Sequence, residues 1–172
     1  MNKIILVGYM GSGKSTVGKA LANSLNIPFY DLDSIIEQNL GLSISEIFNQ
    51  KGEVFFRKYE HQALHQFLEN HSQFVLSLGG GTPCYANNHE VLKNTDIASF
   101  YLKTSINEIV NRLLQSNNQR PLIVGKSKEE LTEYVAKHLF DRSYFYHQSK
   151  NTVLTDGKTT DAVVAELVSK LT

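Results

Sequence analysis

The chain contains few cysteines and no long apolar run. Cys84 is the single cysteine among 172 residues, so no disulfide forms within the chain, which is typical of proteins from reducing compartments. No apolar run approaches the roughly 20 residues that a membrane-spanning helix needs. The chain enters an apolar strand-like run at Lys3 and leaves no room for a signal peptide, so we expect a cytoplasmic protein.

The chain also lacks an excess of charge of either sign. Lys and Arg together number 17, as do Asp and Glu, so the net charge is zero. Proteins that bind nucleic acid or anionic membranes as their main partner carry a net basic surface, and we expect neither partner here. No linker, repeat or low-complexity segment divides the sequence, and its length suffices for one domain with a sizeable core. We therefore predict a single domain and expect a monomer.

Short apolar runs alternate with helical patterns along the whole chain. This alternation is typical of parallel βαβ units with helices on both faces of the sheet. We predict strands at residues 3–7, 28–30, 74–78, 97–102 and 152–155, and long helices at 17–25, 53–69 and 129–146. Capping-box spacing begins two short helices, at Ser34 and at Ser43, which meet near Gly41.

Residues 8–16 read Gly-Tyr-Met-Gly-Ser-Gly-Lys-Ser-Thr and fit the pattern G-x-x-x-x-G-K-[ST]. They lie between the first predicted strand and the first helix, which is the context of a phosphate-binding loop. Its glycines allow a tight turn whose N–H groups point into one concavity at the positive end of the helix. Lys14 would reach the β- and γ-phosphates, and the Ser15 hydroxyl would bind Mg²⁺. A mere linking turn would explain neither side chain, so we predict binding of ATP or GTP.

Asp31 and Asp33 form a D-x-D pair at the end of the second predicted strand. An extended backbone would point both side chains the same way. Phosphoryl transfer needs one carboxylate near the magnesium ion and another near the attacking hydroxyl, and this pair could supply both. The alternative is that Asp33 only caps the next helix, although Ser34 already offers a cap.

Two arginines interrupt or extend apolar helix faces. Arg57 and Glu60 lie three residues apart on a face that continues through Leu64, and alone they would be interpreted as a structural ion pair. Arg142 stands where the apolar stripe of the last long helix predicts a core residue. Because a buried guanidinium without a partner is costly, a ligand carboxylate or phosphate would satisfy it.

Three consecutive glycines, Gly79, Gly80 and Gly81, follow the third predicted strand. They suit a place where another group must approach the backbone closely, and a flexible turn is the alternative. His61 and His65 have the i, i+4 spacing of a helical zinc pair, but no third ligand is evident. We therefore interpret the two histidines as part of a surface face.

Taken in order, these motifs resemble those of the shikimate kinase family over essentially the whole chain. They are GYMGSGKST, DLD, GEVFFRKYE, LGGG, RPL and RSYFY. Many families share the phosphate-binding loop, whereas D-x-D, F-R-x-x-E and G-G-G together are much more specific. The resemblance implies a three-layer α/β P-loop kinase fold with a five-stranded parallel sheet, a substrate-binding subdomain at about 32–60 and a lid at about 112–126. It also implies ATP-dependent phosphorylation of the shikimate 3-hydroxyl, which yields shikimate 3-phosphate and ADP on the route to chorismate.

The resemblance also implies residue roles. Asp33 would contact the shikimate hydroxyls and position or deprotonate the attacking one, while Lys14 and the lid residue Arg120 would stabilise the transferring phosphoryl group. Arg57, held by Glu60, and Arg142 would grip the shikimate carboxylate. The remaining residues implied to contact the acceptor are Gly79, Gly80, Gly81, Phe48 and Phe56. The residues implied to bind ATP are Gly11, Ser12, Gly13, Lys14, Ser15, Thr16, Arg112, Arg120 and Lys158. Mg²⁺ would be held by Ser15 and, through water, by Asp31.

Two rival functions fit parts of the same pattern. A P-loop kinase for a nucleoside monophosphate would need a second phosphate site and a base slot, whereas one for a sugar acid is harder to exclude because that acceptor also carries a carboxylate. A nucleotide sensor without turnover belongs to a different class. A degraded site should have lost Lys14, Asp33 or Arg120, and all three are present. The Asn-Lys-x-Asp motif of guanine-binding switch proteins is absent.

Overall fold

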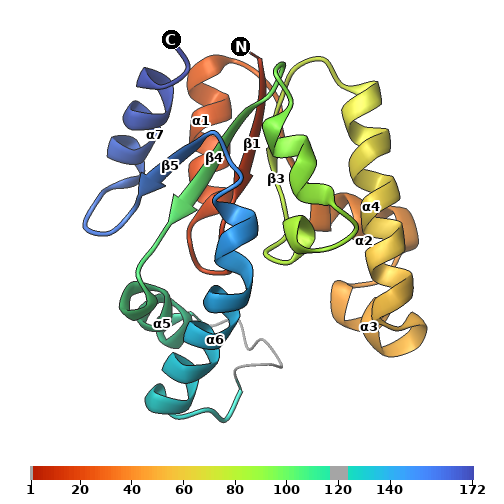
Figure 1. Ribbon diagram of the computed structural model, residues 1–172, viewed down its shortest axis with the longest axis vertical. Coiled ribbons are helices and arrows are strands. Elements are labelled where there is room, and N and C mark those ends of the chain that lie inside the picture. Colours follow the sequence, from red (N-terminus) through yellow and green to blue (C-terminus); the bar gives the residue numbers. More distant parts are fainter. Residues whose placement is uncertain (1, 117–123) are drawn as a thin grey trace.

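A single parallel sheet organises the molecule. The structure is a computed structural model that describes residues 2–116 and 124–172. Within these residues the sheet has five strands in the order β2-β3-β1-β4-β5 (Figure 1). The strands are β1 (Lys3–Val7), β2 (Phe29–Asp31), β3 (Phe74–Ser77), β4 (Ala98–Lys103) and β5 (Asn151–Leu154), and each pairs in parallel with its neighbour. This arrangement confirms the predicted fold class and, within one or two residues at each end, the predicted strands.

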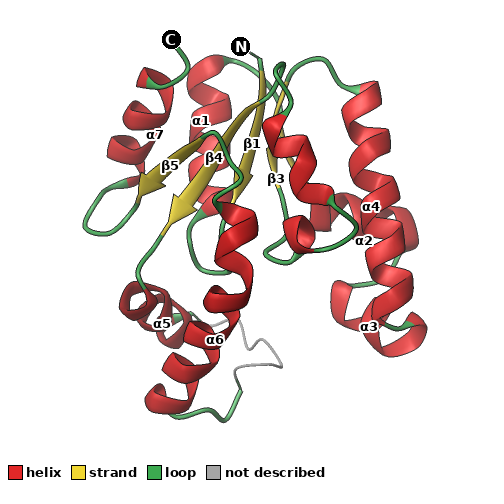
Figure 2. Cartoon of the chain, in the orientation of Figure 1, coloured by secondary structure: helices red, strands yellow, loops and turns green. Residues whose placement is uncertain are grey.

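Helices cover both faces of the sheet (Figure 2). On one face lie α1 (Lys14–Leu25) and α7 (Thr160–Ser169). On the other lie α4 (Glu53–Asn70) and α6 (Lys128–Tyr146). The remaining helices are α2 (Leu32–Leu40), α3 (Ile44–Lys51), α5 (Ile106–Gln115) and the 3₁₀ helices η1 (Thr82–Cys84) and η2 (Asn88–Lys93). The described helices include none with both the length and the apolar character to span a bilayer.

The strands are apolar throughout because both of their faces are buried. In β1, Ile4 and Leu6 belong to the cluster under α1 and α7, while Ile5 and Val7 belong to the cluster under α4 and α6. All four side chains are at most 1% exposed. Alternate residues of this strand thus pack into two separate hydrophobic cores. For this reason the strand is a continuous apolar run and does not alternate between apolar and polar residues.

The two short helices begin differently from one another. Ser43 and Glu46 form the predicted capping box at the start of α3. The start of α2 was predicted wrongly, because Asp31, and not Ser34, is its N-cap. The Asp31 carboxylate accepts a hydrogen bond from the Ser34 backbone N–H at 3.1 Å, so the helix begins at Leu32, directly after the strand.

Candidate active site

Three neighbouring strands end at the same edge of the sheet and deliver the predicted motifs there. The phosphate-binding loop follows β1, Asp31 ends β2, and the glycine triplet follows β3, one residue beyond its end. A cavity of about 420 Å³ lies between them. The predicted site residues that line it are Gly11, Gly13, Lys14, Ser15, Thr16, Asp31, Asp33, Gly79 and Gly80.

The phosphate-binding loop has the backbone conformation that its glycines predict. Gly11 and Gly13 have φ values of 80° and 89°, in the left-handed region that favours glycine. Gly13 is also the N-cap of α1 and offers no side-chain cap, which leaves N–H groups of the first turn for an anion. The Lys14 ammonium donates to the carbonyl oxygens of Gly8, at 2.6 Å, and Tyr9, at 3.1 Å. The loop therefore brings a positive charge and helix-end donors to one cavity.

The two aspartates occupy different kinds of backbone, contrary to the extended D-x-D that the sequence predicts. Asp31 closes β2, whereas Asp33 lies in the first turn of α2. Both still line the cavity. The Ser15 hydroxyl donates to Asp31 Oδ2 at 3.3 Å, which joins the end of β2 to the phosphate-binding loop. Asp33 does not cap the helix, since Asp31 does, so the capping alternative for Asp33 does not hold.

Asp33 titrates well above an ordinary aspartate. Burial and, to a smaller extent, the nearby carboxylates of Asp31 and Glu60 together raise the pKa of its carboxyl from 3.8 to about 6, while Lys14 opposes the shift. A carboxyl with a pKa of about 6 is ionised at neutral pH and is a stronger base than an ordinary aspartate. This is the electrostatic setting expected of a group that accepts a proton from an alcohol.

Each glycine of the triplet makes room for one functional side chain. A methyl group on Gly79 would lie 2.9 Å from Asp33 Oδ1, and one on Gly81 would lie 2.7 Å from an Arg57 guanidinium nitrogen. A methyl group on Gly80 would lie 3.2 Å from the Arg142 guanidinium. None of the three has positive φ, so close approach and not conformational freedom requires glycine here.

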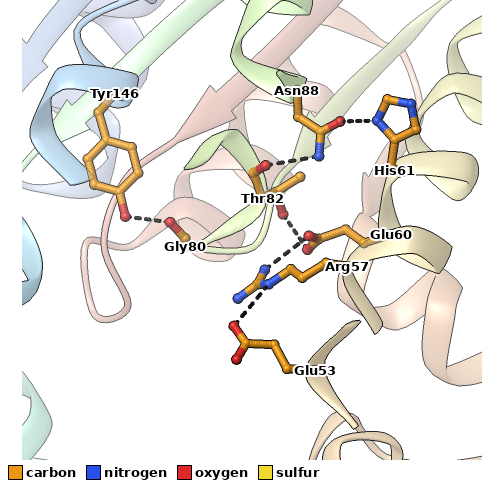
Figure 3. Close-up of polar contacts among 8 residues, drawn as sticks. All are labelled: Glu53, Arg57, Glu60, His61, Gly80, Thr82, Asn88 and Tyr146. Atoms are coloured by element: carbon orange, nitrogen blue, oxygen red, sulfur yellow. Dashed lines mark hydrogen bonds and ion pairs between the residues drawn. The ribbon is translucent and has the colours of Figure 1, made fainter. Parts of the chain in front are cut away.

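The triplet is held in place by its own carbonyl groups. The carbonyl oxygen of Gly79 accepts from the Thr82 N–H at 3.1 Å, and that of Gly81 accepts from the Cys84 N–H at 3.0 Å. The Tyr146 hydroxyl donates to the Gly80 carbonyl at 2.6 Å (Figure 3). Burial raises the pKa of Tyr146, which keeps this phenol protonated and able to donate. The alternative of a flexible turn is therefore wrong.

Arg57 lies among two carboxylates, those of Glu60 and, at 3.9 Å, Glu53, and several aromatic rings. Its Nη1 donates to Glu60 Oε1 at 3.0 Å (Figure 3), and the Glu60 side chain is 1% exposed. The guanidinium carbon lies 4.0 Å from the centre of the Tyr85 ring and 5.1 Å from that of Phe56. Phe48 packs on Phe56, with ring centres 4.7 Å apart. The predicted Arg57, Glu60, Phe48 and Phe56 thus form one group, and Tyr85 joins it unpredicted.

Arg142 enters from the opposite side of the triplet. It is half-buried on α6, and its guanidinium carbon lies 5.8 Å from the centre of the Tyr9 ring. Arg57 of α4 and Arg142 of α6 thus flank neighbouring glycines from two different helices. Two cations on either side of one short loop suit a carboxylate ligand.

A second cavity, of about 360 Å³, adjoins the other side of the phosphate-binding loop. Arg112 donates from Nη1 to the Gly11 carbonyl at 3.0 Å and from Nε to Glu108, also at 3.0 Å. Lys158 forms an ion pair with Glu166 at 2.6 Å. The predicted residues that line this cavity are Gly11, Ser12, Gly13, Thr16, Arg112 and Lys158, and Thr155 lines it without having been predicted.

Some predicted residues lie outside the described part of the chain, and some residues near the site were not predicted. Arg120 and the middle of the predicted lid fall within 117–123, outside the described residues, so the role of Arg120 and the lid itself stay predictions. Tyr85 and Thr82 were missed because they sit in a loop and a 3₁₀ turn without periodicity. Their only sequence signal is proximity to the glycine triplet.

His61, predicted as part of a surface face, is half-buried, and its Nδ1 lies 2.6 Å from Asn88 Oδ1, within hydrogen-bonding distance.

The fold and this cavity together define the class of protein: a P-loop kinase with three-layer α/β architecture. A model of the family described as "Shikimate kinase" matches residues 10–172. The chain therefore belongs to the shikimate kinase family, as its motifs predicted, and ATP is the co-substrate of that family's reaction.

Individual relatives agree with this result over nearly the full length of the chain. A shikimate kinase from Flavobacterium johnsoniae is 48% identical over 171 residues, which are 99% of each chain. The crystal structure of shikimate kinase from Bacteroides thetaiotaomicron has a TM-score of 0.92 and 34% identity, covering 99% of this chain and 98% of that one. The structure of the Acinetobacter baumannii enzyme in complex with shikimate has a TM-score of 0.87 and 31% identity, with 99% and 93% covered.

Proposed function

We propose that this chain transfers the γ-phosphoryl group of ATP to the 3-hydroxyl of shikimate, which yields shikimate 3-phosphate and ADP. Beyond the family relationship, the observation that carries this proposal is the convergence of Asp33, Arg57 and Arg142 on three successive glycines. One carboxylate and two guanidinium groups around a tight loop match an acceptor that has a hydroxyl at one end and a carboxylate at the other.

In this proposal the acceptor end works through positioning. Arg57 and Arg142 hold the shikimate carboxylate, and the glycine triplet lets the ring approach the backbone. Phe48 and Phe56 supply the apolar wall. Asp33 receives a hydrogen bond from the 3-hydroxyl and takes its proton as the phosphoryl group is transferred. Holding the two reactants in line supplies much of the rate enhancement in phosphoryl transfer.

The phosphate end works through charge. The N–H groups of residues 11–16 and the Lys14 ammonium would bind the β- and γ-phosphates. Ser15 and Asp31 together present hydroxyl and carboxylate oxygens, which are the donors that Mg²⁺ prefers, and Ser15 Oγ already lies 3.3 Å from Asp31 Oδ2. When bound, the ion would neutralise phosphate charge. Arg112 and Lys158, beside the second cavity, would border the nucleoside part of ATP.

We also propose that α2, α3 and the start of α4, about residues 32–60, serve as the substrate-binding subdomain. These segments carry Asp33, Phe48, Phe56, Arg57 and Glu60, five of the acceptor-end side chains. In Figure 1 they stand together at one side of the sheet, and α5 with the first turns of α6 stands at the other. Residues 112–126 would form the lid between α5 and α6.

The direct test is ADP release from Mg·ATP with shikimate, gluconate, AMP or no acceptor. The proposal expects turnover with shikimate only. Arg57→Ala should raise the KM for shikimate by about 10- to 100-fold, the worth of a charge-assisted hydrogen bond, with little change in kcat. Lys58→Ala, at the exposed neighbouring position, is the matched control. Release with gluconate or AMP and none with shikimate would overturn the acceptor, and an unchanged shikimate KM in Arg57→Ala would overturn the carboxylate contact.

A further inference from the structure

A chain of hydrogen bonds runs from Arg57 away from the cavity and into the protein (Figure 3). Arg57 Nη1 donates to Glu60 Oε1 at 3.0 Å, and the other carboxylate oxygen, Oε2, accepts from the Thr82 hydroxyl at 2.8 Å. The Thr82 carbonyl accepts from the Asn88 side-chain amide at 3.0 Å, and Asn88 Oδ1 lies 2.6 Å from His61 Nδ1. Three elements thus meet in one hydrogen-bond network: α4, η2, and η1, which directly follows the glycine triplet.

The direction of each hydrogen bond follows from the groups present. The Thr82 carbonyl can only accept, so the Asn88 amide nitrogen must face it and the amide oxygen must face His61. That oxygen can only accept, so His61 Nδ1 carries a proton. The Glu60 carboxylate accepts at both oxygens. Every link therefore has one donor and one acceptor, which is the condition for a buried polar network to fix a geometry.

The central side chains of this hydrogen-bond network are buried, which restricts their orientations. Glu60 is 1% exposed, and Thr82 and Asn88 are 0% exposed. A buried carboxylate that loses a donor carries a large desolvation cost, so Glu60 is held strongly in the orientation that serves both Thr82 and Arg57. The Arg57 side chain is 16% exposed, and its buried Nε makes no hydrogen bond within the described residues but lies 3.9 Å from a carboxylate oxygen of Glu53, which is 57% exposed (Figure 3). Because an exposed ion pair is weak, the hydrogen bond to buried Glu60 is the main contact that orients the guanidinium in its plane, and the Tyr85 ring lies against its face.

We infer that Thr82 is a positioning residue for the acceptor carboxylate: it fixes Glu60, and through Glu60 it aims Arg57. Asn88 and His61 hold Thr82 in turn. Thr82 is suited to this because its backbone N–H closes the turn of the glycine triplet, by donating to the Gly79 carbonyl at 3.1 Å, while its hydroxyl reaches Glu60. One residue thus ties the arginine to the loop against which the acceptor would lie. This inference rests on the proposed function for the identity of the acceptor.

The first arm of the test is steady-state kinetics on Thr82→Val, which keeps the shape and removes the hydroxyl. We expect the KM for shikimate to rise about tenfold, the worth of one misaligned charge-assisted hydrogen bond, with kcat and the KM for ATP within about twofold. Thr82→Ser restores the hydroxyl and should return the KM to near the wild-type value. His61→Ala, at the outer end of the chain, should raise the KM about two- to threefold.

Ser99→Ala is the matched control for a buried hydroxyl that serves structure alone. Ser99 is 0% exposed, donates to the Leu92 carbonyl at 2.6 Å and accepts from the Lys150 N–H at 2.9 Å, in the middle of β4. It should lower the melting temperature and leave the shikimate KM unchanged. If Thr82→Val behaves in the same way, with a lower melting temperature and an unchanged KM, Thr82 is merely structural and the inference is overturned.

The second arm needs no turnover. The Arg57 side-chain N–H resonances, identified by their loss in Arg57→Lys, are followed by ¹⁵N NMR in the ligand-free protein. Thr82→Val should broaden or shift them, and Thr82→Ser should not. If wild-type protein fails to phosphorylate shikimate but this response is seen, the proposed acceptor fails and the coupling of Thr82 to Arg57 stands. If the resonances of Thr82→Val match the wild type, the coupling itself fails.

Discussion

The phosphate end and the proposed acceptor end of the site are built on different principles. The phosphate end is made from one continuous segment, residues 8–16, and relies on backbone N–H groups with a single lysine. The acceptor end is made from side chains on three helices, α2, α4 and α6, that meet over three glycines. Between Asp33 and Arg142 lies more than half of the chain. A local motif can therefore specify the first end completely, whereas only the whole fold can specify the second.

The two ends of the site should also differ in the amino-acid substitutions that they tolerate. At the phosphate end most contacts come from the backbone, so side chains such as Tyr9 and Met10 are free to vary as far as phosphate binding is concerned. At the acceptor end each contact is one side chain with its own support: Asp33 has α2, and Arg57 has Glu60 and Tyr85. We expect single substitutions there to change one kinetic parameter each, and the following predictions test that separation.

The largest effect should come from Asp33→Asn at the acceptor end. A positioned proton acceptor contributes about 10²- to 10⁴-fold, so we expect kcat to fall about 10³-fold with the shikimate KM little changed. The raised pKa of Asp33, about 6, places the acidic limb of the wild-type kcat/KM profile near that pH. Residual activity of the variant should lack this limb. A wild-type profile that stays flat down to about pH 5 would show that Asp33 does not need to be ionised.

The same substitution should stabilise the fold at neutral and alkaline pH. Because the folded protein raises the pKa of Asp33 from 3.8 to about 6, the folded state holds this proton more tightly than the unfolded state does. Folding stability is therefore lost as the pH rises through that window, by about 3 kcal/mol at most. Asparagine avoids this loss. The melting temperature of Asp33→Asn should exceed that of the wild type at about pH 8, and the gap should narrow towards about pH 4.

The next effect belongs to the phosphate end. Lys14→Met should lower kcat about 100-fold, since it removes one charged donor from the transferring group, and it should leave the shikimate KM little changed. Lys19→Met, at an exposed position of the same helix α1, is the matched control and should match the wild type. Assays at saturating ATP with varied shikimate measure kcat and the shikimate KM of both variants. A loss confined to the shikimate KM would break the separation of the two ends.

A pair of glycine substitutions should divide the acceptor end itself. A methyl group on Gly79 pushes against Asp33 and lies 3.0 Å from the Thr82 hydroxyl, whereas one on Gly81 pushes against Arg57. We expect Gly79→Ala to lower kcat about tenfold and, through Thr82, to raise the shikimate KM as well, whereas Gly81→Ala should raise the KM about tenfold with kcat little changed, because small displacements of positioned groups are costly. Full steady-state kinetics on both variants, with melting temperatures to exclude unfolding, measures the split. A fall in kcat of the same size in both variants would mean that the triplet moves as a unit.

The smallest effect should come from Arg112→Ala beside the second cavity. A half-buried arginine that borders an aromatic base contributes about 1 kcal/mol, so we expect the KM for ATP to rise about fivefold. The shikimate KM, measured in the same preparation at saturating ATP, serves as the internal control. A change in the shikimate KM and none in the ATP KM would place Arg112 at the wrong end.

The sequence predicted the sheet, the phosphate-binding loop and the side chains of Asp33, Arg57 and Arg142 that lie around the glycine triplet, for reasons that differ. Strands buried on both faces are continuous apolar runs, and the loop is one contiguous motif, so local patterns suffice. Asp33, Arg57 and Arg142 were brought together only by resemblance to a family. The start of α2 was wrong because Asp31 ends a strand and caps a helix at once, which no periodicity reveals. Tyr85, Thr82 and Asn88 were missed because their partners lie across three elements.

The glycine triplet also gives the acceptor hydroxyl a direction. Each of its three carbonyl groups already accepts a hydrogen bond from within the described protein, from Thr82, Tyr146 and Cys84. A neutral carbonyl that already accepts one hydrogen bond is a weaker acceptor for a further proton than a carboxylate is, and the carboxylate beside Gly79 is that of Asp33. In the proposed reaction, the internal hydrogen bonds of a short loop would thus leave Asp33 as the destination of the hydroxyl proton before any phosphate arrives.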